Sequence, residues 1–465
     1  MTDYSSYQSP FSWRYGSQEM RRIWSENQKR LLWRKIWVCL AEIQMQFGLV
    51  LPEQVEDIKR HADQVDIQRS IEIEAEIHHD LMAELRAFAE RCPLGGGILH
   101  LGATSMDIED NADVLRQREA LQLLLSRVKE LLLVFADRIE AEAETMVMAF
   151  THIQPAEPTT LGYRLAMYAQ DLLEDWQEIQ SMLANLRGKG FKGAVGTGAA
   201  YGELLGNKNL AEFENRLSDK LALPFYSITT QTYPRRQDFE LINVLAGIGA
   251  SLYKFAFDLR LLQSPPIGEM SEPFGSRQVG SSAMPFKRNP INSEKIDSLA
   301  RTLSGMPAMA WHNAAHSLLE RTLDDSANRR SLIPEAFLIC DEILLTTTRI
   351  VRGLRINREA IQRNLALYAP FAATERVMME AAKAGADRQE CHERLRTHAL
   401  AAWQAVQLGQ ANPLVELIRA DRFFSERIPV NVMEKLFEVT GYVGIAPQRA
   451  REFAQRIRQC VAGVN

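Results

Sequence analysis

The chain has 465 residues, 46 % of them hydrophobic and 24 % charged, which is the composition of an ordinary globular protein. Its 54 Lys and Arg residues against 59 Asp and Glu residues give a net charge of −5, which argues against nucleic acid and anionic membranes as partners. No apolar run approaches the roughly 18 residues of a membrane span, no signal-peptide pattern is present, and the five scattered cysteines predict reduced thiols in the cytoplasm.

Helical periodicity is the dominant signal along the chain. Two amphipathic stretches, 19–47 and 53–91, lead to a glycine run at 95–97 that we interpret as a hinge. Five further stripes, with apolar residues at alternating spacings of four and three, then predict a bundle of long helices. These stripes cover about 107–144, 160–186, 239–262, a stretch that starts near 290, and 331–354.

The segments between the stripes give weaker signals. Residues 224–234 could hold one short extended segment, whereas 151–156 is expected to be a loop between two long helices. Shorter helices follow a break at 353–357. We therefore predict an all-α fold with three helical domains, 1–103, 104–356 and 357–465, of which the central one is the bundle of five long helices.

The segment 280–290 is the strongest candidate for chemistry. It places Ser281, Lys287 and Asn289 just before a helix that we expect to start at Pro290, with Asn289 as its N-cap. Backbone N–H groups, a fixed cation and the positive end of a helix dipole together suit an anion. A surface loop with an ordinary cap explains the same residues about equally well, so both interpretations stay open here.

Three other polar segments stand out. His152 lies in the expected loop 151–156, where it can act as a general acid or base or serve as a simple connector. The run 78–80 holds two histidines and an aspartate within a helical stretch, so at most one histidine faces any given site. The segment 320–330 holds three arginines, which suit phosphate or carboxylate but are equally typical of a solvated turn.

Taken in order along the chain, these motifs resemble the fumarase/aspartase superfamily of lyases. The segment 280–290 looks like the superfamily signature, and shorter matches run from 13–17 to 383–389. Within the superfamily, the chain is most similar to the adenylosuccinate lyases of purine biosynthesis. This resemblance implies elimination of fumarate from two succinylated purine nucleotides, without a cofactor or metal. It also implies a homotetramer whose long helices form a multi-subunit core and whose active sites are shared between chains.

The resemblance also implies a role for individual residues. Ser281 matches the catalytic base and His152 the acid, while Glu294 matches the glutamate that supports the charge on the histidine. Lys287 would hold the carboxylate that takes up negative charge, and His79 matches a second histidine of the family. The other implied substrate contacts are Arg14, Tyr15, His78, Asp80, Thr104, Ser105, Gln231, Asn289, Lys295, Arg321, Ser326 and Arg330.

Two residues depart from the family pattern. Lys295 stands where many relatives carry arginine, and Phe286 stands where tyrosine or histidine is common. Neither change removes a proposed chemical group, so both bear on substrate preference. Two alternatives remain open. One is a sister enzyme such as an argininosuccinate lyase, which needs no phosphate-binding arginines. The other is a non-catalytic helical scaffold, which should lack at least one of four residues: Ser281, His152, Lys287 and Glu294.

Overall fold

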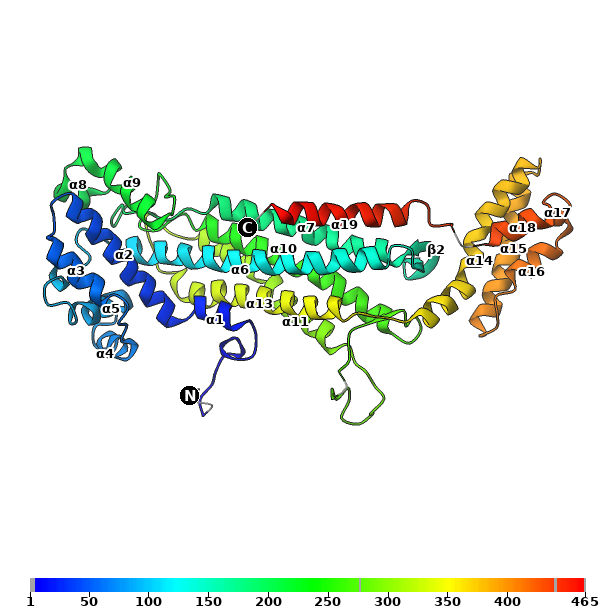
Figure 1. Ribbon diagram of the computed structural model, residues 1–465, viewed down its shortest axis with the longest axis horizontal. Coiled ribbons are helices and arrows are strands. Elements are labelled where there is room, and N and C mark those ends of the chain that lie inside the picture. Colours follow the sequence, from blue (N-terminus) through cyan, green and yellow to red (C-terminus); the bar gives the residue numbers. More distant parts are fainter. Residues whose placement is uncertain (1–4, 276, 439–440, 464–465) are drawn as a thin grey trace. The chain divides into compact units, whose positions relative to one another are not determined.

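The computed structural model describes residues 5–275, 277–438 and 441–463, most of which are helical (Figure 1). The chain divides into two compact units. Four long helices contribute residues to both units: α6 (Ser105–Ala141), α7 (Leu161–Asn185), α10 (Arg236–Gln263) and α13 (Ser326–Arg352). The units therefore do not follow the order of the chain, and the division into three domains stays a prediction. The first unit is Met1–Val128, Asp175–Ala250 and Ser298–Leu345; the second is Lys129–Glu174, Ser251–Asp297 and Thr346–Asn465.

The predicted N-terminal helices are present but interrupted. The stretch 19–47 breaks at Ser25, whose side chain accepts a hydrogen bond from the N–H of Gln28 and caps the second helix. Arg34 on this second helix donates to Glu84 on α5 at 2.6 Å, and both side chains are fully buried. The helices are α1 (Gln18–Ile23), α2 (Glu26–Gln46), α3 (Pro52–His61), α4 (Ile67–Ile77) and α5 (Asp80–Ala89).

Four of the five predicted stripes form single long helices. The fourth stripe is the exception, because Gly305 and Pro307 divide it into α11 (Ile291–Ser304) and α12 (Met306–Ala315). By length and composition alone, α10 could cross a membrane; one such helix is weak evidence, since core helices of soluble bundles pass the same test. The four long helices are α6 (Ser105–Ala141), α7 (Leu161–Asn185), α10 (Arg236–Gln263) and α13 (Ser326–Arg352).

Short strands correct the all-α prediction. The expected loop at 151–156 is instead the tip of an antiparallel hairpin formed by β1 (Met146–Thr151) and β2 (Gln154–Thr160). A second pair joins β3 (Met270–Ser271) to β4 (Arg355–Ile356). The extended segment expected at 224–234 contributes only an isolated bridge at Phe225. The fold is therefore mostly helical with two small sheets.

The expectation of shorter helices after the break at 353–357 is confirmed only in part: α14 has 26 residues and matches the bundle helix α7, which has 25, whereas the helices after α14 have 20 residues or fewer. In the second unit, α14 to α18 pack around a buried cluster that includes Val377, Cys391, Ile418 and Phe424. In the first unit, α8 (Ala199–Leu205) is followed by α9 (Leu210–Leu221), which contacts α2 (Figure 1). The C-terminal helices are α14 (Arg358–Lys383), α15 (Arg388–Gln407), α16 (Leu414–Ala420), α17 (Arg422–Ser425), α18 (Val430–Phe437) and α19 (Ala446–Ala462).

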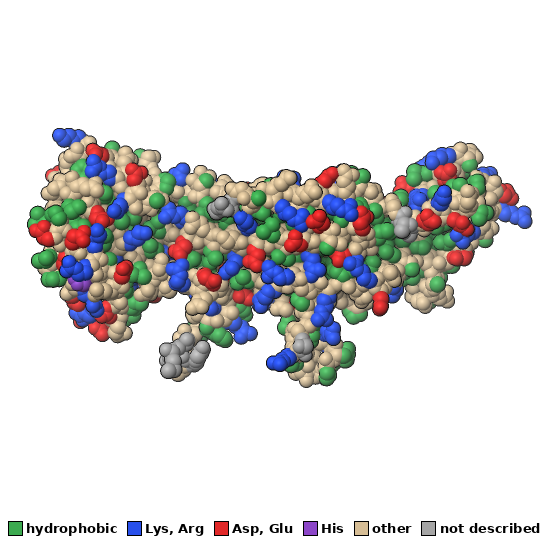
Figure 2. Space-filling model, viewed as in Figure 1, with side chains coloured by type: hydrophobic (Ala, Val, Ile, Leu, Met, Phe, Trp, Pro, Cys, Tyr) green, Lys and Arg blue, Asp and Glu red, His purple; other side chains and the backbone are tan. Residues whose placement is uncertain are grey.

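The surface carries charges of both signs. Figure 2 shows Lys and Arg side chains interspersed with Asp and Glu side chains on the visible face, in keeping with the net charge of −5. All five cysteines are free thiols, and four of them are buried. Burial raises the pKa of Cys39 and of Cys92 to about 11, which keeps both thiols protonated and unreactive near neutral pH.

Candidate active site

Ser281 lies on a long loop, 272–290, that connects β3 to α11 in the second unit (Figure 1). Its Oγ accepts hydrogen bonds from the backbone N–H groups of Ala283, at 3.3 Å, and Met284, at 3.1 Å. Lys287 on the same loop is exposed, and so is Phe286. The loop therefore presents a hydroxyl oxygen, two N–H donors and a cation within one short turn, the combination expected for an anion or an alkoxide.

The two ends of this turn are held together. The side-chain amide of Asn289 donates to the carbonyl oxygen of Gly280 at 3.1 Å. A Cβ on Gly280 would lie 2.1 Å from the carbonyl oxygen of Lys287, so this close approach requires glycine. Because α11 starts at Ile291, Asn289 does not cap that helix, which corrects the sequence expectation.

The N-terminus of α11 is capped instead by Glu272, a residue that the sequence did not single out. Its buried carboxylate accepts the N–H of Asn292 at 3.3 and 3.2 Å. Burial raises the pKa of Glu272, since desolvation disfavours the charged carboxylate. This contact ties the start of the loop to the helix that follows it.

His152 is at the exposed tip of the β1–β2 hairpin. It and Ile153 form the two-residue turn, with φ of 53° and 61°. Within the described part of the chain, the His152 side chain makes no hydrogen bond or ion pair. Glu294 lies on the first turn of α11, half exposed, with its nearest cation, Arg260, 4.0 Å away. Neither Ser281 nor Glu294 therefore makes a hydrogen bond or ion pair with His152 within the described chain. Lys295 is the next residue after Glu294 on α11.

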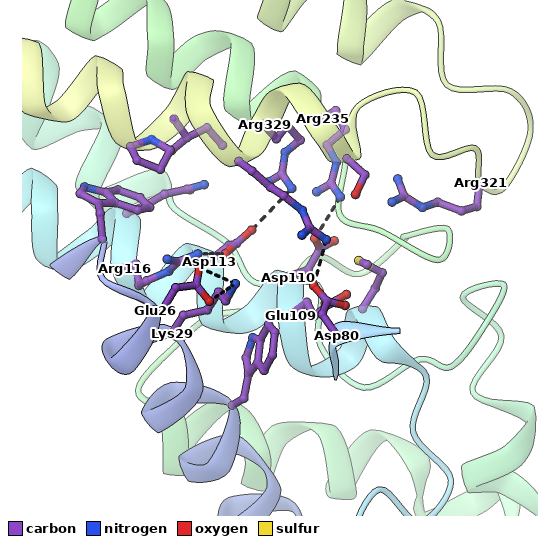
Figure 3. Close-up of a pocket in the computed structure, with 18 residues that line it drawn as sticks. Glu26, Lys29, Asp80, Glu109, Asp110, Asp113, Arg116, Arg235, Arg321 and Arg329 are labelled. Carbon is purple, nitrogen blue, oxygen red and sulfur yellow. Dashed lines mark hydrogen bonds and ion pairs between the residues drawn. The ribbon is translucent and has the colours of Figure 1, made fainter. Parts of the chain in front are cut away.

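The first unit contains a polar cavity of about 150 Å³ (Figure 3). Four residues that the sequence assigned to the substrate line it: Asp80, Arg321, Ser326 and Arg330. Arginine side chains predominate among the cations, as expected for recognition of phosphate or carboxylate. The other charged lining residues are Glu26, Lys29, Glu109, Asp110, Asp113, Arg116, Arg235 and Arg329.

Carboxylates hold the arginines of this cavity in place. Arg330 donates to Asp80 at 2.9 Å, and Arg321 donates to Asp325 at 2.7 Å. Sequence reasoning missed the two buried arginines behind them. Arg235 also donates to Asp325, at 2.6 Å, and Arg329 donates to Asp238 at 2.8 Å. Nothing in the charge pattern of 320–330 distinguishes Arg329, which is buried, from Arg330, which faces the cavity opening.

Glu109 is the carboxylate of this cavity that lacks a partner. In the described chain it makes no hydrogen bond or ion pair, and Figure 3 shows it close to Asp80. Burial, followed by repulsion from Asp80, Asp113 and Asp110, raises its pKa to about 8, and attraction to Lys29 offsets this rise only in part. Glu109 is thus largely protonated at neutral pH and can donate a hydrogen bond into the cavity.

Replacing Glu109 with glutamine is expected to stabilise the protein at alkaline pH. Between about pH 4.5 and pH 8 the folded state holds a proton that the unfolded state has lost, so stability falls as pH rises through this window. The neutral Glu109→Gln variant avoids that loss. Denaturant unfolding should show nearly equal stability at about pH 4, below this window, and a gain of about 1–3 kcal/mol at pH 8.5. A gain that is the same at both pH values, or one matched by Glu119→Gln on the exposed side of α6, would contradict this reasoning.

His79 and Ser105 meet near the start of α6. The sequence predicted that the run 78–80 lies within a helix, and this prediction is wrong. The run lies at a break between two helices: His78 has φ of 54° and ends α4, and His79 caps α5. This turn directs the Nε2 of His79 toward Ser105, whose Oγ lies 3.4 Å away. Thr104, just before α6, uses its backbone N–H to bind Asp107 at 3.0 Å.

Three further assigned residues lie outside the lining of this cavity. The Arg14 guanidinium stacks on its sequence neighbours, 5.6 Å from the ring centre of Trp13 and 5.9 Å from that of Tyr15. Gln231 lies in a bend and uses its backbone N–H to bind the carbonyl oxygen of Glu320 at 3.2 Å, next to Arg321. The catalytic and substrate-binding residues expected from the sequence are therefore divided between the two units.

Comparison with known proteins places these features in one family. A family model described as "Lyase" matches residues 14–305, and one described as "Adenylosuccinate lyase C-terminus" matches residues 370–453. An adenylosuccinate lyase from Schistosoma mansoni is 38 % identical over 91 % of this chain and 90 % of its own length. One from Saccharomyces cerevisiae is 37 % identical over 98 % of this chain and 95 % of its own length.

Solved structures share the fold at lower identity. A fumarate lyase from Mesorhizobium superposes with a TM-score of 0.84 and 23 % identity, covering 97 % of this chain and 99 % of the other. A 3-carboxy-cis,cis-muconate lactonizing enzyme from Pseudomonas putida gives a TM-score of 0.85 and 24 % identity, with 97 % and 100 % covered. These two likenesses concern the fold alone, because one fold hosts several reactions.

Proposed function

The chain belongs to the adenylosuccinate lyase family, and from this membership we propose that it is a carbon–nitrogen lyase that splits adenylosuccinate into AMP and fumarate. The second proposed substrate is the succinylated carboxamide ribotide, which gives aminoimidazole carboxamide ribotide and fumarate. The observation that supports a phosphorylated substrate is the arginine-lined cavity of the first unit, where Arg321, Ser326 and Arg330 offer donors to a phosphate.

The proposed reaction is an elimination that needs only proton transfer and charge stabilisation. Ser281 Oγ removes the proton next to a carboxylate, the C–N bond breaks, and His152 gives a proton to the leaving nitrogen. A serine hydroxyl ionises with difficulty in water, so the alkoxide needs strong stabilisation. The N–H groups of Ala283 and Met284 at Ser281, together with Lys287, can supply it once water is excluded.

We also propose a cytoplasmic homotetramer with shared active sites. Free, mostly buried thiols fit a reducing compartment. The isolation of His152 and Ser281 from each other within one chain fits sites completed by a neighbouring chain. In such an assembly Glu294, whose carboxylate is half exposed, would support the charge on a partner's histidine.

A side-by-side assay tests the proposed activity. Purified protein should release fumarate from adenylosuccinate, with no release from argininosuccinate, before and after exhaustive chelation. Turnover of argininosuccinate alone would favour the sister-lyase alternative, and absence of turnover with both substrates would favour the scaffold. Loss of activity on chelation that zinc restores would contradict a reaction without a metal.

Arg330→Ala is expected to raise the KM for adenylosuccinate about tenfold or more, with a much smaller change in kcat. The reason is that a hydrogen bond to a charged group contributes about 1.5–3 kcal/mol, and a phosphate contact is made in both ground and transition states. Steady-state kinetics measures the effect. Arg352→Ala is the matched control, since it removes an equally exposed arginine of α13 that is paired with Glu130. Equal KM values in both variants would place the phosphate elsewhere.

A further inference from the structure

A second cavity, of about 710 Å³, lies in the second unit at the base of the loop 272–290. Its walls come from both ends of this loop, from the end of α10 and from the segment 355–363, which contains β4 and the start of α14. Among the residues assigned above to the substrate, Asn289 is the one that lines it. Its volume is in the range of small-molecule sites.

The cavity has an excess of positive charge. Four arginines line it: Arg288, Arg355, Arg358 and Arg363. Arg358 is paired with Glu142 at 2.7 Å. In the described chain, the other three have no carboxylate partner. Figure 2 shows basic side chains where the loop joins the helices.

The contacts that these three arginines do make leave their charge uncompensated. Arg355 donates to the carbonyl oxygen of Phe274 at 2.6 Å, and Arg363 donates to that of Ile267 at 3.1 Å. The guanidinium of Arg288 lies 5.3 Å from the ring centre of Phe274. A carbonyl oxygen or a ring face orients a guanidinium without neutralising it, so each arginine keeps donors and charge for a ligand.

The acidic residues of the cavity do not balance this charge. Glu272 is buried, and its carboxylate is bound to the N-terminus of α11 through Asn292. Glu359 is exposed in the first turn of α14. It is therefore the one acidic side chain among the described lining residues that faces solvent at this cavity.

We propose that this cavity binds a small anion carrying two or more phosphate groups, and that the bound anion holds the two ends of the loop 272–290 together. Arginine forks match phosphate oxygens, and the separated guanidiniums suit more than one phosphate. Arg355 binds the carbonyl oxygen of Phe274, before the Ser281 turn, and Arg288 follows that turn, so an anion that bridges Arg355 and Arg288 restrains it. Binding is independent of the proposed elimination; its influence on turnover rests on that proposed function.

Hydrogen exchange with inorganic pyrophosphate tests the site. Pyrophosphate should slow exchange of the amides in 272–290 and 355–363. The Arg288→Gln, Arg363→Gln double variant should raise the half-saturating concentration about tenfold or more, because each substitution removes a charge-assisted hydrogen bond. Glu359→Gln should lower that concentration about two- to threefold by removing a repulsive charge. Tighter binding of pyrophosphate by this variant could not result from misfolding. Arg352→Gln, outside the cavity, is the control and should change nothing.

Two results would overturn the proposal: no slowing of exchange in these segments, or the same half-saturating concentration in the double variant as in the parent protein. If fumarate slows amide exchange in these segments as much as pyrophosphate does, the proposal that the ligand carries phosphate groups is wrong. The proposed function is judged separately. If pyrophosphate slows exchange but the protein does not cleave adenylosuccinate, the anion site is supported and the proposed activity is contradicted. If the protein cleaves adenylosuccinate but pyrophosphate does not slow exchange, the activity is supported and the anion site is contradicted.

Discussion

Replacing Ser281 with alanine is expected to lower kcat for adenylosuccinate at least about a thousandfold, because the substitution removes the group that takes the proton. The backbone N–H groups of Ala283 and Met284 stay in place, so the KM should change little. Single-turnover and steady-state rates measure the effect. Ser282→Ala, on the exposed neighbouring residue, is the matched control and should retain nearly full activity.

The opposite outcome has a clear meaning. If Ser281→Ala keeps more than about a tenth of the parent kcat, the base is another group, and the N–H donors at Ser281 serve only to hold a loop turn. A large fall in kcat for Ser282→Ala as well would indicate that the loop conformation, which depends on Gly280 and Asn289, has been disturbed.

The long helices could be predicted because burial repeats along them with the helical period. In α6, Leu121, Val128, Leu132 and Ile139 are all fully buried. This spacing sets both the buried face and the length, so α6 runs from Ser105 to Ala141 where the stripe predicted about 107–144. The fourth stripe failed as a single long helix because a periodic pattern does not report the backbone break that Gly305 and Pro307 impose.

The β1–β2 hairpin could not be predicted because its local signals are weak. β2 contains Pro155 and Pro158, which disfavour a strand. The turn consists of His152 and Ile153, neither of which normally takes a positive φ, in place of the Asn-Gly type that marks a tight hairpin. The pairing is imposed by the surrounding fold and not by propensity. His152 could be identified as a candidate acid, but not as the tip of a hairpin.

The sequence identified polar candidates without showing which of them are buried together. Arg329 and Arg330 are neighbours in the chain, yet the first is 9 % exposed and bound to Asp238, while the second is 61 % exposed and bound to Asp80. Adjacent helix positions point about 100° apart, so only the packing of α13 decides which arginine faces the cavity. For the same reason, Arg235 could not be identified as a cavity residue from the sequence, since it lies outside every motif.

Mixing two inactive variants is expected to restore activity if sites are shared between chains. His152→Ala and Ser281→Ala should each be nearly inactive, because each lacks one of the two proton-transfer groups. In a single chain the side chains of His152 and Ser281 do not contact each other, and both are accessible to a neighbouring chain. If they come from different chains, random exchange of subunits in equal amounts leaves about a quarter of the sites with both intact groups.

The measurement is fumarate release after the two variants exchange subunits, with hybrid formation verified by native mass spectrometry. Each variant taken through the same exchange alone is the control, and should stay inactive. Recovery to about a quarter of the parent activity supports sites built from different chains. Hybrids as inactive as their parents would mean that His152 and Ser281 serve one site from one chain. The loop 272–290 would then have to move until Ser281 reaches the hairpin tip of its own chain, and the isolation of His152 would be a property of the open state alone.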